Sequence, residues 1–165
     1  MKIYTKAGDH MKTDACGHQV FKDDIVMECL GTIDELSALI MMSYHHSNII
    51  LIKEDLLHIA RLLSKLCIAL LKENESYINI DLVKELEEKI DGYQKLISPL
   101  QKFVIPGETL TGSYLHFTRT IARRLERRIV TYFKKTKYNL YIMQFVNRLS
   151  DLLFVMARYE EEKNV

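Results

Sequence analysis

Residues 115–128 read LHFTRTIARRLERR, and this stretch decides the fold because it has the period of an amphipathic helix. At about 100° per residue, one broad arc collects the side chains expected to be buried. These are Tyr114, Phe117, Thr118, Ile121, Leu125, Ile129 and Tyr132. The opposite side carries Arg119, Arg123, Glu126 and Arg127. We therefore predict a helix from about Leu110 to Phe133 that buries one side only.

Periodic apolar residues before and after this stretch predict further helices. We expect them to run from about Val26 to His46, from Asp55 to Leu71, from an N-cap at Asp81 to Ser98–Pro99, and from Asn139 to Glu161. A short apolar linker, Phe103–Gly107, ends in a Pro-Gly turn. Five amphipathic helices with short connections are typical of an up-and-down bundle. The predicted fold class is therefore all-α.

The first residues differ from the rest of the chain. Residues 1–24 hold two of the six glycines, Gly8 and Gly17, and show no helical period. We predict an ordered but irregular N-terminal arm, followed by the helical bundle over residues 26–161. No internal repeat or linker divides the sequence, so residues 1–165 are expected to form a single domain.

The composition narrows the class of protein. Hydrophobic residues make up 48% and charged residues 27%, which is typical of a globular protein. The formal net charge of +1 gives no bulk field toward nucleic acid or a membrane surface, so neither is expected as a partner. The three cysteines, Cys16, Cys29 and Cys67, are far apart, and the N-terminus lacks the apolar core of a signal peptide. We expect a soluble, cytoplasmic protein.

All the cations of the central stretch are arginines, and Arg124 and Arg128 lie between its two sides. A solvated helix usually mixes lysine with glutamate, whereas arginine can grip a phosphate through two parallel hydrogen bonds. The residues alone leave two interpretations about equal. The arginine side binds a phosphate, or it is an exposed face or a subunit interface with salt bridges.

Polar residues of the last predicted helix lie opposite its buried side. They are Gln144, Asn147, Asp151 and Arg158. Asparagine is unfavourable in mid-helix, so Asn147 is expected to bond to another helix or to contact a ligand. In the first helix, Asp34 shares its side with Ala38, Met41 and Met42. A carboxylate in apolar surroundings needs a cationic partner, and an arginine of the central stretch is the candidate.

The segment Tyr4–Asp9, with Thr13 and Lys22, combines hydroxyl groups, a glycine and cations. Backbone amides can approach a phosphate at such a glycine, lysine adds charge, and the Asp9 carboxylate could help to hold Mg²⁺. The sequence contains neither a P-loop nor a dinucleotide-binding fingerprint, and its histidines lack metal-ligand spacing. We expect His58 and His116 at the surface or at an interface.

Taken together, these segments resemble the PduO-type ATP:cob(I)alamin adenosyltransferases. The matching blocks are IYTKAGD at 3–9, KDD at 22–24, GTIDELSA at 31–38, FVIPG at 103–107, LHFTRTIARRLERR at 115–128 and FVNRLSDLLFVMAR at 145–158. The resemblance implies a five-helix bundle that assembles as a homotrimer with active sites between subunits. It also implies that cob(I)alamin attacks C5′ of ATP, giving adenosylcobalamin and triphosphate. A flavin-type reductase is a candidate partner that would supply the reduced corrinoid.

The resemblance also assigns roles by position. The front loop would bind ATP through Thr5, Lys6, Ala7, Gly8, Thr13 and Lys22. The helices would hold ATP and Mg²⁺ through Arg123, Arg124, Glu126, Arg127 and Asn147. Asp34 and Arg119 would pair near the corrin, and Phe103 would occupy its lower face and exclude the axial base. Mg²⁺ would be held mainly through ATP, with Asp9 or Glu126 as a protein ligand.

The front loop departs from the family's pattern. Ala7 replaces a threonine, His10–Met11 stands where x-Gly is expected, and Cys16–Gln19 replaces a turn with a basic residue. Positive φ is costly for Met11, so the loop is expected to fold differently, to bind ATP more weakly or to order only with ligand. One alternative is a non-catalytic corrinoid- or nucleotide-binding paralogue that acts as a sensor or carrier. Another is a structural bundle whose arginines only build an oligomer or meet an acidic partner.

Overall fold

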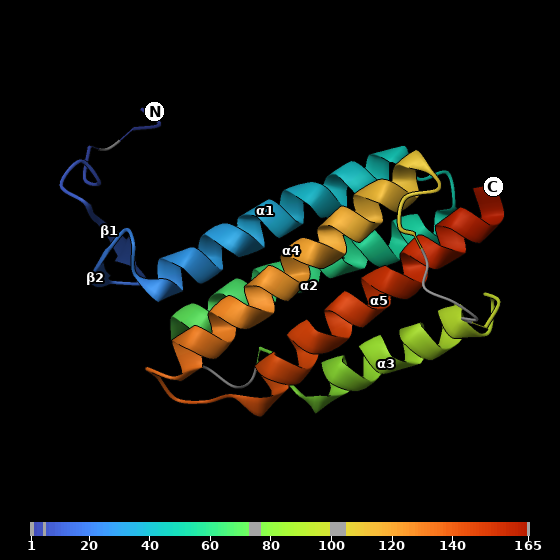
Figure 1. The fold of residues 1–165 in the computed structure, drawn as a ribbon. Coiled ribbons are helices and arrows are strands. Elements are labelled where there is room, and N and C mark those ends of the chain that lie inside the picture. The colour runs from blue at the N-terminus through green and yellow to red at the C-terminus, as the bar shows by residue number, and fades with distance from the viewer. Residues whose placement is uncertain (1, 5, 73–76, 100–104, 165) are drawn as a thin grey trace.

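A computed structural model gives the fold and describes residues 2–4, 6–72, 77–99 and 105–164 (Figure 1). The elements are β1 (Lys12–Ala15), β2 (His18–Phe21), α1 (Ile25–His46), α2 (Ile50–Lys72), α3 (Ile80–Gln94), α4 (Leu110–Phe133) and α5 (Leu140–Asn164). The helices form one bundle, and the β1–β2 hairpin lies beyond the N-terminal end of α1 (Figure 1). The prediction of an all-α, five-helix bundle is confirmed.

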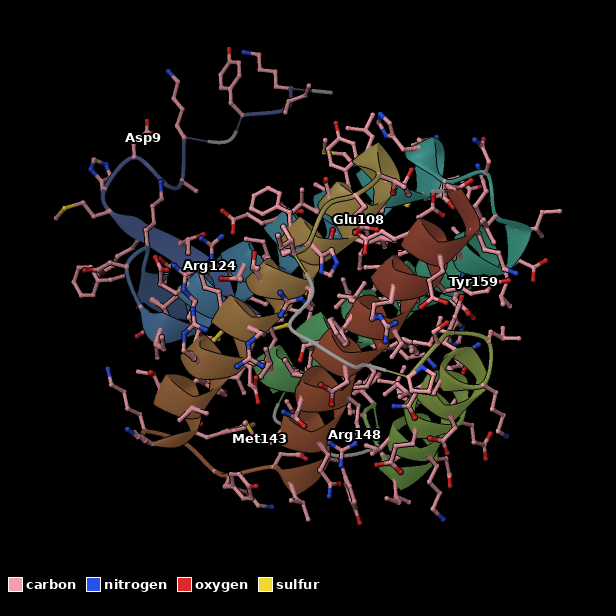
Figure 2. The ribbon with its side chains drawn as sticks, turned by 45° about the vertical axis from the view of Figure 1, so that its right-hand side comes forward. Asp9, Glu108, Arg124, Met143, Arg148 and Tyr159 are labelled. Carbon is pink, nitrogen blue, oxygen red and sulfur yellow. The ribbon has the colours of Figure 1, made fainter. Side chains whose placement is uncertain are left out.

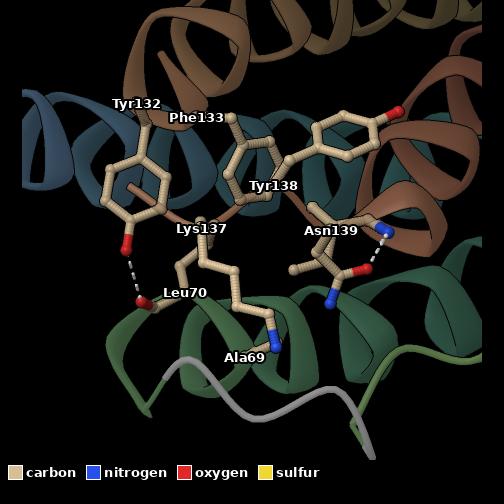
Figure 3. A pocket seen from close by; sticks show the side chains of 8 residues that line it. Ala69, Leu70, Tyr132, Phe133, Lys137, Tyr138 and Asn139 are labelled. Carbon is tan, nitrogen blue, oxygen red and sulfur yellow. Dashed lines mark hydrogen bonds between the residues drawn. The ribbon is translucent and has the colours of Figure 1, made fainter. Parts of the chain in front are cut away.

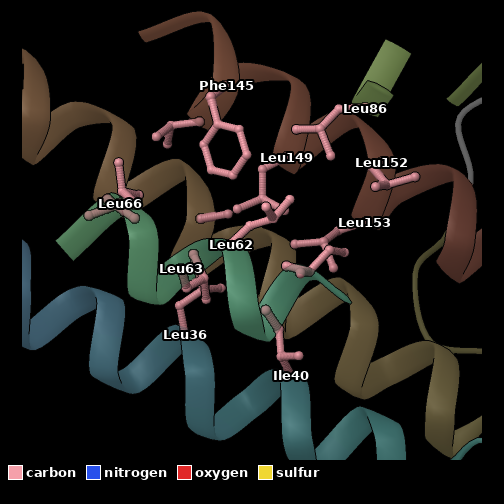
Figure 4. Close-up of a cluster of buried hydrophobic side chains, with 14 of the residues drawn as sticks. Leu36, Ile40, Leu62, Leu63, Leu66, Leu86, Phe145, Leu149, Leu152 and Leu153 are labelled. Atoms are coloured by element: carbon pink, nitrogen blue, oxygen red, sulfur yellow. The ribbon is translucent and has the colours of Figure 1, made fainter. Parts of the chain in front are cut away.

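The central helix organises the packing because α4 contacts both α1 and α5. The helix α2 packs beside α1, and α3 packs beside α5. Aliphatic side chains from these helices meet in one core, which includes Leu36 of α1, Leu63 of α2, Leu86 of α3 and Leu153 of α5 (Figure 4). Burial of this apolar surface is the main stabilising contribution to the bundle.

The bounds of α4 are those predicted, and Thr109 caps it by accepting a hydrogen bond from the Gly112 amide at 2.9 Å. The predicted buried arc is nevertheless too wide. Phe117 is 53% exposed and Tyr114 is half-buried, because α1 and α5 cover a narrower strip of α4. The rest of the arc is buried as predicted, from Thr118 to Tyr132.

Two predicted helix starts are wrong. Asn79, not Asp81, caps α3, and its Oδ1 accepts a hydrogen bond from the Leu82 amide at 3.1 Å. The helix α2 begins at Ile50 rather than Asp55. Asp55 is buried instead, because it ties α2 to α3 through Lys89 Nζ at 2.6 Å and the Tyr93 hydroxyl at 2.8 Å.

The N-terminal arm is more regular than predicted. Strands β1 and β2 form an antiparallel hairpin in which Lys12 pairs with Phe21 and Ala15 with His18. Cys16 and Gly17 turn the chain with φ of 55° and 89°. Positive φ at both central residues suits the right-handed twist of a two-residue hairpin, and glycine adopts it at no steric cost. The glycine between two short polar-apolar runs was the sequence signal for this hairpin.

Among the described helices, α5 alone is long and apolar enough to cross a membrane. However, 56% of its most apolar window is buried in the bundle. Leu149, Leu152, Leu153 and Met156 are in the core, as predicted. The apolar character of α5 is therefore accounted for by its contacts with α3 and α4.

Candidate functional site

The arginines of α4 fall into two groups. Arg124 forms an ion pair with Glu35 of α1, and Arg128 pairs with Glu28 of α1 at 2.7 Å and donates to Thr32. These two side chains tie α4 to α1. The second group comprises Arg119, Arg123 and Arg127, and we call it the arginine face. In the described part of the chain, no carboxylate lies within ion-pair distance of the arginine face.

The guanidinium group of Arg119 lies against an aromatic ring rather than against a carboxylate. Its Nε is buried and has no hydrogen-bond partner in the described part of the chain, and its guanidinium carbon lies 5.9 Å from the centre of the Phe154 ring. Burial lowers the pKa of Arg119, and the neighbouring charge of Arg123 lowers it further. A buried guanidinium nitrogen with no acceptor is costly in the isolated chain.

The predicted pair between Asp34 and Arg119 is not formed within one chain. Asp34 is exposed in the single chain, as are Ala38 and Met42 on the same side of α1. It faces α2, where its charge adds to burial in raising the pKa of the Cys67 thiol. The side of α1 that meets α4 carries Glu28 and Glu35 instead. An internal pair would require Asp34 to lie on that side.

A chain of polar contacts crosses three helices at the centre of the site. Arg148 of α5 pairs through Nε with Glu87 of α3 at 2.8 Å, and its Nη1 donates to Asn147 Oδ1 at 2.7 Å. Asn147 Nδ2 donates to Glu126 Oε1 of α4 at 3.0 Å. The helix-to-helix bond expected as one explanation of Asn147 is therefore present. Glu126 shares a side of α4 with Arg123, three residues earlier in the sequence.

Asp151 extends this group along α5. Burial raises the pKa of Asp151, while the charge of Arg148 lowers it, that of Glu126 raises it and that of Arg123 lowers it. The side chain of Asp151 on α5 therefore lies close enough to Glu126 and Arg123 of α4 for their charges to affect its pKa. The arginine face, Glu126, Asn147 and Asp151 form one polar surface along α4 and α5, which could hold a polyanion through its cations.

The last turns of α5 hold the two ends of the segment that contains Phe103. Arg158 Nη2 donates to the Ser98 carbonyl at 2.9 Å and pairs with Glu162 at 2.7 Å, while Glu162 accepts from the Ser98 amide at 2.9 Å. Glu161 Oε1 accepts from the amides of Gly107 at 2.9 Å and Glu108 at 3.2 Å. Phe103 itself lies outside the described residues, as does Thr5.

A groove of about 530 Å³ runs beside these contacts, between α3 and α5. Its lining includes Pro99, Asp151, Phe154 and Arg158. Arg158, predicted on the polar side of α5, is only 9% exposed because residues 98–99 cover it. The roles of Arg148, Arg158 and Glu161 were not predicted from the sequence, although Arg158 and Glu162 are spaced as an i, i+4 ion pair.

A second hollow lies between α2 and the α4–α5 connection and includes Leu70, Tyr132 and Phe133 in its lining (Figure 3). The Tyr132 hydroxyl donates to the Leu70 carbonyl at 3.1 Å across it. Its volume of about 20 Å³ suits a water molecule, not a nucleotide. We assign it no part in the site.

His116 is buried, so its predicted place at the surface or an interface is wrong. It is 5% exposed, its Nε2 lies 3.5 Å from Glu161 Oε1, and neither ring nitrogen has a hydrogen-bond partner among the described residues. Burial lowers the pKa of His116, although the Glu161 charge opposes this, and the Arg119 charge lowers the pKa further. Burial in the folded chain therefore favours the neutral form of the imidazole over its protonated form.

This histidine predicts a pH dependence of stability. Its pKa is lower in the folded than in the unfolded chain, so stability is complete above the unfolded pKa of about 6.5 and is lost as the pH falls below it. We expect His116→Asn to reduce the loss of unfolding free energy between about pH 7.5 and pH 5.5. Urea unfolding at several pH values measures this. The exposed His45→Asn serves as the control, and an unchanged pH slope in His116→Asn would contradict the prediction.

The front loop gathers three of its predicted ligand residues. The Asp9 amide donates to the Lys6 carbonyl at 3.2 Å, and the Lys22 amide donates to the Met11 carbonyl at 2.9 Å. A Cβ at Gly8 would lie 3.1 Å from Lys22 Nζ, so this ammonium group lies against the glycine. Lys6 and Met11 both adopt positive φ, near 61° and 62°. The loop therefore takes the backbone form that a glycine would take more readily.

The two halves of the predicted nucleotide site remain apart in the single chain. Among the described residues, no hydrogen bond or ion pair joins Lys6, Gly8 or Lys22 to the arginine face. The arm extends away from the bundle at the N-terminal end of α1, whereas Arg124 lies on the side of the bundle (Figure 2). Thr13 lies in β1, and Ala7 is exposed in the loop. The described residues of one chain alone therefore do not enclose a nucleotide.

Comparisons with known proteins cover nearly the whole chain. The model of the family described as cobalamin adenosyltransferase matches residues 3–160. A corrinoid adenosyltransferase of Bacillus subtilis is 34% identical over 96% of this chain and 86% of its own length. The corrinoid adenosyltransferase MMAB of Mus musculus is 36% identical over 98% of this chain and 73% of its own.

A solved structure shows the same fold. It is a phenylalanine-to-histidine variant of a PduO-type ATP:corrinoid adenosyltransferase from Lactobacillus reuteri, complexed with cobalamin and ATP. It superposes with a TM-score of 0.90 at 33% identity and covers 98% of this chain and 91% of its own. A second structure from that organism, an arginine-to-lysine variant complexed with ATP, has a TM-score of 0.91.

Proposed function

The chain belongs to the cobalamin adenosyltransferase family, and we propose that its polar surface on α4 and α5 carries out that chemistry. The enzyme transfers the 5′-deoxyadenosyl group of ATP to cob(I)alamin. A Co–C5′ bond forms with the electron pair of the reduced cobalt, the C5′–O bond of ATP breaks, and triphosphate leaves with that bonding pair. The observation that carries the proposal is the arginine face, a set of cations without carboxylate partners among the described residues.

The leaving group explains why arginines predominate. Negative charge grows on the triphosphate as the C5′–O bond breaks, and preorganised donors aimed at that charge lower the barrier. Arg123 and Arg127 lie one turn apart on α4, and Arg127 Nη1 donates to the Arg123 carbonyl at 3.1 Å. No general base is required, because the nucleophile is a metal centre of the substrate. This agrees with a polar surface built from arginine, asparagine and carboxylate groups.

Mg²⁺ fits this surface as an ion held mainly by the triphosphate. Within the described residues, no group of three or more histidine, cysteine or acidic side chains could hold a metal ion. Mg²⁺ usually needs only one or two protein carboxylates when phosphates supply the other ligands. Glu126 is the first candidate, since only its Oε1 is engaged by Asn147, and Asp9 in the front loop is the second. Bound there, Mg²⁺ would offset negative charge on the phosphates.

We place the corrin over the groove between α3 and α5. Pro99 lines this groove, and Phe103 follows a few residues later in the sequence. An aromatic side chain at the lower axial position would fill space without coordinating cobalt. Removing the axial base makes cob(II)alamin easier to reduce, because the empty axial position lowers the orbital that accepts the electron. Phe103 is thus proposed to favour formation of cob(I)alamin.

We further propose a homotrimer in which neighbouring subunits complete each site. Two observations support it. The front loop and the arginine face lie apart in one chain, and Asp34 and Arg119 each lack a partner of opposite charge within ion-pair distance among the described residues. Asp34 of one subunit would pair with Arg119 of the next, and the front loop would cover the neighbour's arginine face. A carboxylate that accepts two parallel hydrogen bonds would stabilise the half-buried guanidinium of Arg119.

A charge exchange tests the pair between subunits. We expect Arg119→Asp or Asp34→Arg alone to lower the specific activity about tenfold, because like charges would then meet at the interface. Mixed trimers assembled from the two variants regain part of the activity, because two of their three boundaries then carry opposite charges. At one of these boundaries the introduced arginine faces the introduced aspartate, and at the other the native pair forms again. Light scattering reports assembly and the corrinoid spectrum reports activity. Failure of the mixture to recover, with both single variants impaired, would contradict a pair between subunits.

The location and the reductant are further parts of the proposal. The described cysteines are all free thiols, as expected for a reducing compartment, and we place the enzyme in the cytoplasm. A flavin-type reductase is proposed to supply the electron that turns cob(II)alamin into cob(I)alamin.

The test of function is direct. The protein is incubated with MgATP and chemically reduced cobalamin, while the corrinoid spectrum and triphosphate release are followed. Appearance of adenosylcobalamin with one triphosphate per product supports the proposal, and its absence under conditions that sustain a known adenosyltransferase overturns it. Calorimetry that detects corrinoid binding without ATP affinity would favour the non-catalytic sensor or carrier. The left-handed backbone of Lys6 and Met11 is the observation behind that alternative.

A further inference from the structure

Arg148 lies on α5 beside α3 (Figure 2), and it touches the proposed ATP site through Asn147. Its guanidinium bridges two helices, with Nε on Glu87 of α3 and Nη1 on Asn147 Oδ1. The side chains of Arg148 and Glu87 are 34% and 44% exposed. An ion pair with this much solvent contact contributes little to stability. The ion pair with Glu87 therefore does not explain the position of Arg148, and its contact with Asn147 is the one to consider.

The two neighbours of Asn147 determine which way its amide group faces. Arginine has only donors, so the atom of Asn147 that contacts Arg148 is the oxygen. An ionised carboxylate has only acceptors, so the atom that contacts Glu126 is the nitrogen. The side-chain amide cannot rotate by 180° without placing donor against donor and acceptor against acceptor.

This orientation has a consequence for ligand binding. Asn147 Oδ1 is occupied by Arg148, and one of the two Nδ2 hydrogens is occupied by Glu126. The second Nδ2 hydrogen has no acceptor among the described residues, and we assign it to a ligand acceptor. The same contact holds Glu126 Oε1 in place on the side of α4 that carries the arginine face.

We propose that Arg148 is a positioning residue, which fixes the Asn147 amide so that it donates to a phosphate oxygen of the nucleotide and steadies Glu126. The inference rests on the proposed function, because it requires that Asn147 contacts ATP. Without Arg148, the amide can rotate and present its oxygen to the anion. We expect the removal of Arg148 to weaken ATP binding and to leave corrinoid binding unchanged.

The test compares Arg148→Met with Glu87→Met. Both variants lose the α3–α5 ion pair, so their melting temperatures should fall by similar small amounts, but only Arg148→Met also frees Asn147. We expect the KM for ATP to rise about fivefold in Arg148→Met and to stay within about twofold of wild type in Glu87→Met. Arg148→Lys keeps a donor and is expected to recover most of the affinity. Glu85→Gln is the matched control. Glu85 also lies on α3, but it contacts α2 instead of α5, and it lies 2.6 Å from His58 Nε2.

A double-mutant cycle separates this inference from the proposed function. If Arg148 acts through Asn147, Arg148→Met has no further effect on the KM for ATP in an Asn147→Ala background. Equal effects of Arg148→Met and Glu87→Met, or the same effect of Arg148→Met in both backgrounds, would overturn the positioning role. If Asn147→Ala itself binds ATP normally, the proposed nucleotide contact is wrong and the inference falls with it.

Discussion

Replacing Arg123 by alanine is expected to lower kcat/KM by about 10²- to 10³-fold while leaving the fold intact. Arg123 is exposed, and in the described part of the chain its guanidinium has no carboxylate partner, so its removal leaves no buried charge unpaired. Surface substitutions of this kind change stability by only about 0.5 kcal/mol. The expected loss therefore lies in transition-state stabilisation, because one donor to the leaving triphosphate disappears.

The measurement uses chemically prepared cob(I)alamin, so that reduction cannot limit the rate, and records kcat, KM for ATP and melting temperature. Arg61→Ala is the control, because Arg61 is also exposed but lies on α2, away from the site. Asn147→Ala is expected to behave like Arg123→Ala. Near-normal turnover in Arg123→Ala, with Arg61→Ala also normal, would remove the arginine face from catalysis.

The fold was predictable wherever a strong period coincided with clear end signals. The bounds of α4 agree with the prediction because a Pro-Gly turn and the Thr109 cap precede the helix. The start of α2 was missed because residues 50–54 carry no cap signal, and an acidic residue was mistaken for the beginning of the helix. Asp55 is acidic for a tertiary reason, its contacts with Lys89 and Tyr93, which periodicity cannot reveal.

The site was predictable in its residue types and less so in their contacts. A helical wheel separates the arginine face from the core, but it cannot tell that Arg124 pairs with Glu35 while Arg123 pairs with no acidic group in the described chain. It also gives no measure of the neighbouring helix, so it cannot tell that Asp34 forms no ion pair with Arg119 among the described residues of one chain. The role of Arg148 depends on the exchange of donors and acceptors among three helices. Only the three-dimensional arrangement of the side chains provides that information.

Glu161→Ala is expected to lower the rate of adenosylation from cob(II)alamin by about 10²-fold with little change in the KM for ATP. Glu161 is 3% exposed, and its Oε1 accepts hydrogen bonds from the Gly107 and Glu108 amides. A Cβ at Gly112 would lie 2.6 Å from the same oxygen, so the first turn of α4 fits closely around the carboxylate. The turn at 105–108 directly follows the segment that contains Phe103. Loss of its anchor should misplace the group proposed to exclude the axial base.

The substitution also leaves partly buried amides without an acceptor, at a cost of about 1–3 kcal/mol each, so stability must be measured beside activity. Glu160→Ala provides the matched control. Glu160 is also 3% exposed, but it accepts from Ser47 at the α1–α2 connection and not from the turn at 105–108. Rates are compared with cob(II)alamin plus a reductant and with chemically reduced cob(I)alamin. If Glu161 positions Phe103, the first rate falls more than the second in Glu161→Ala only. Equal losses of the two rates, or the same pattern in Glu160→Ala, would reduce Glu161 to a purely structural residue.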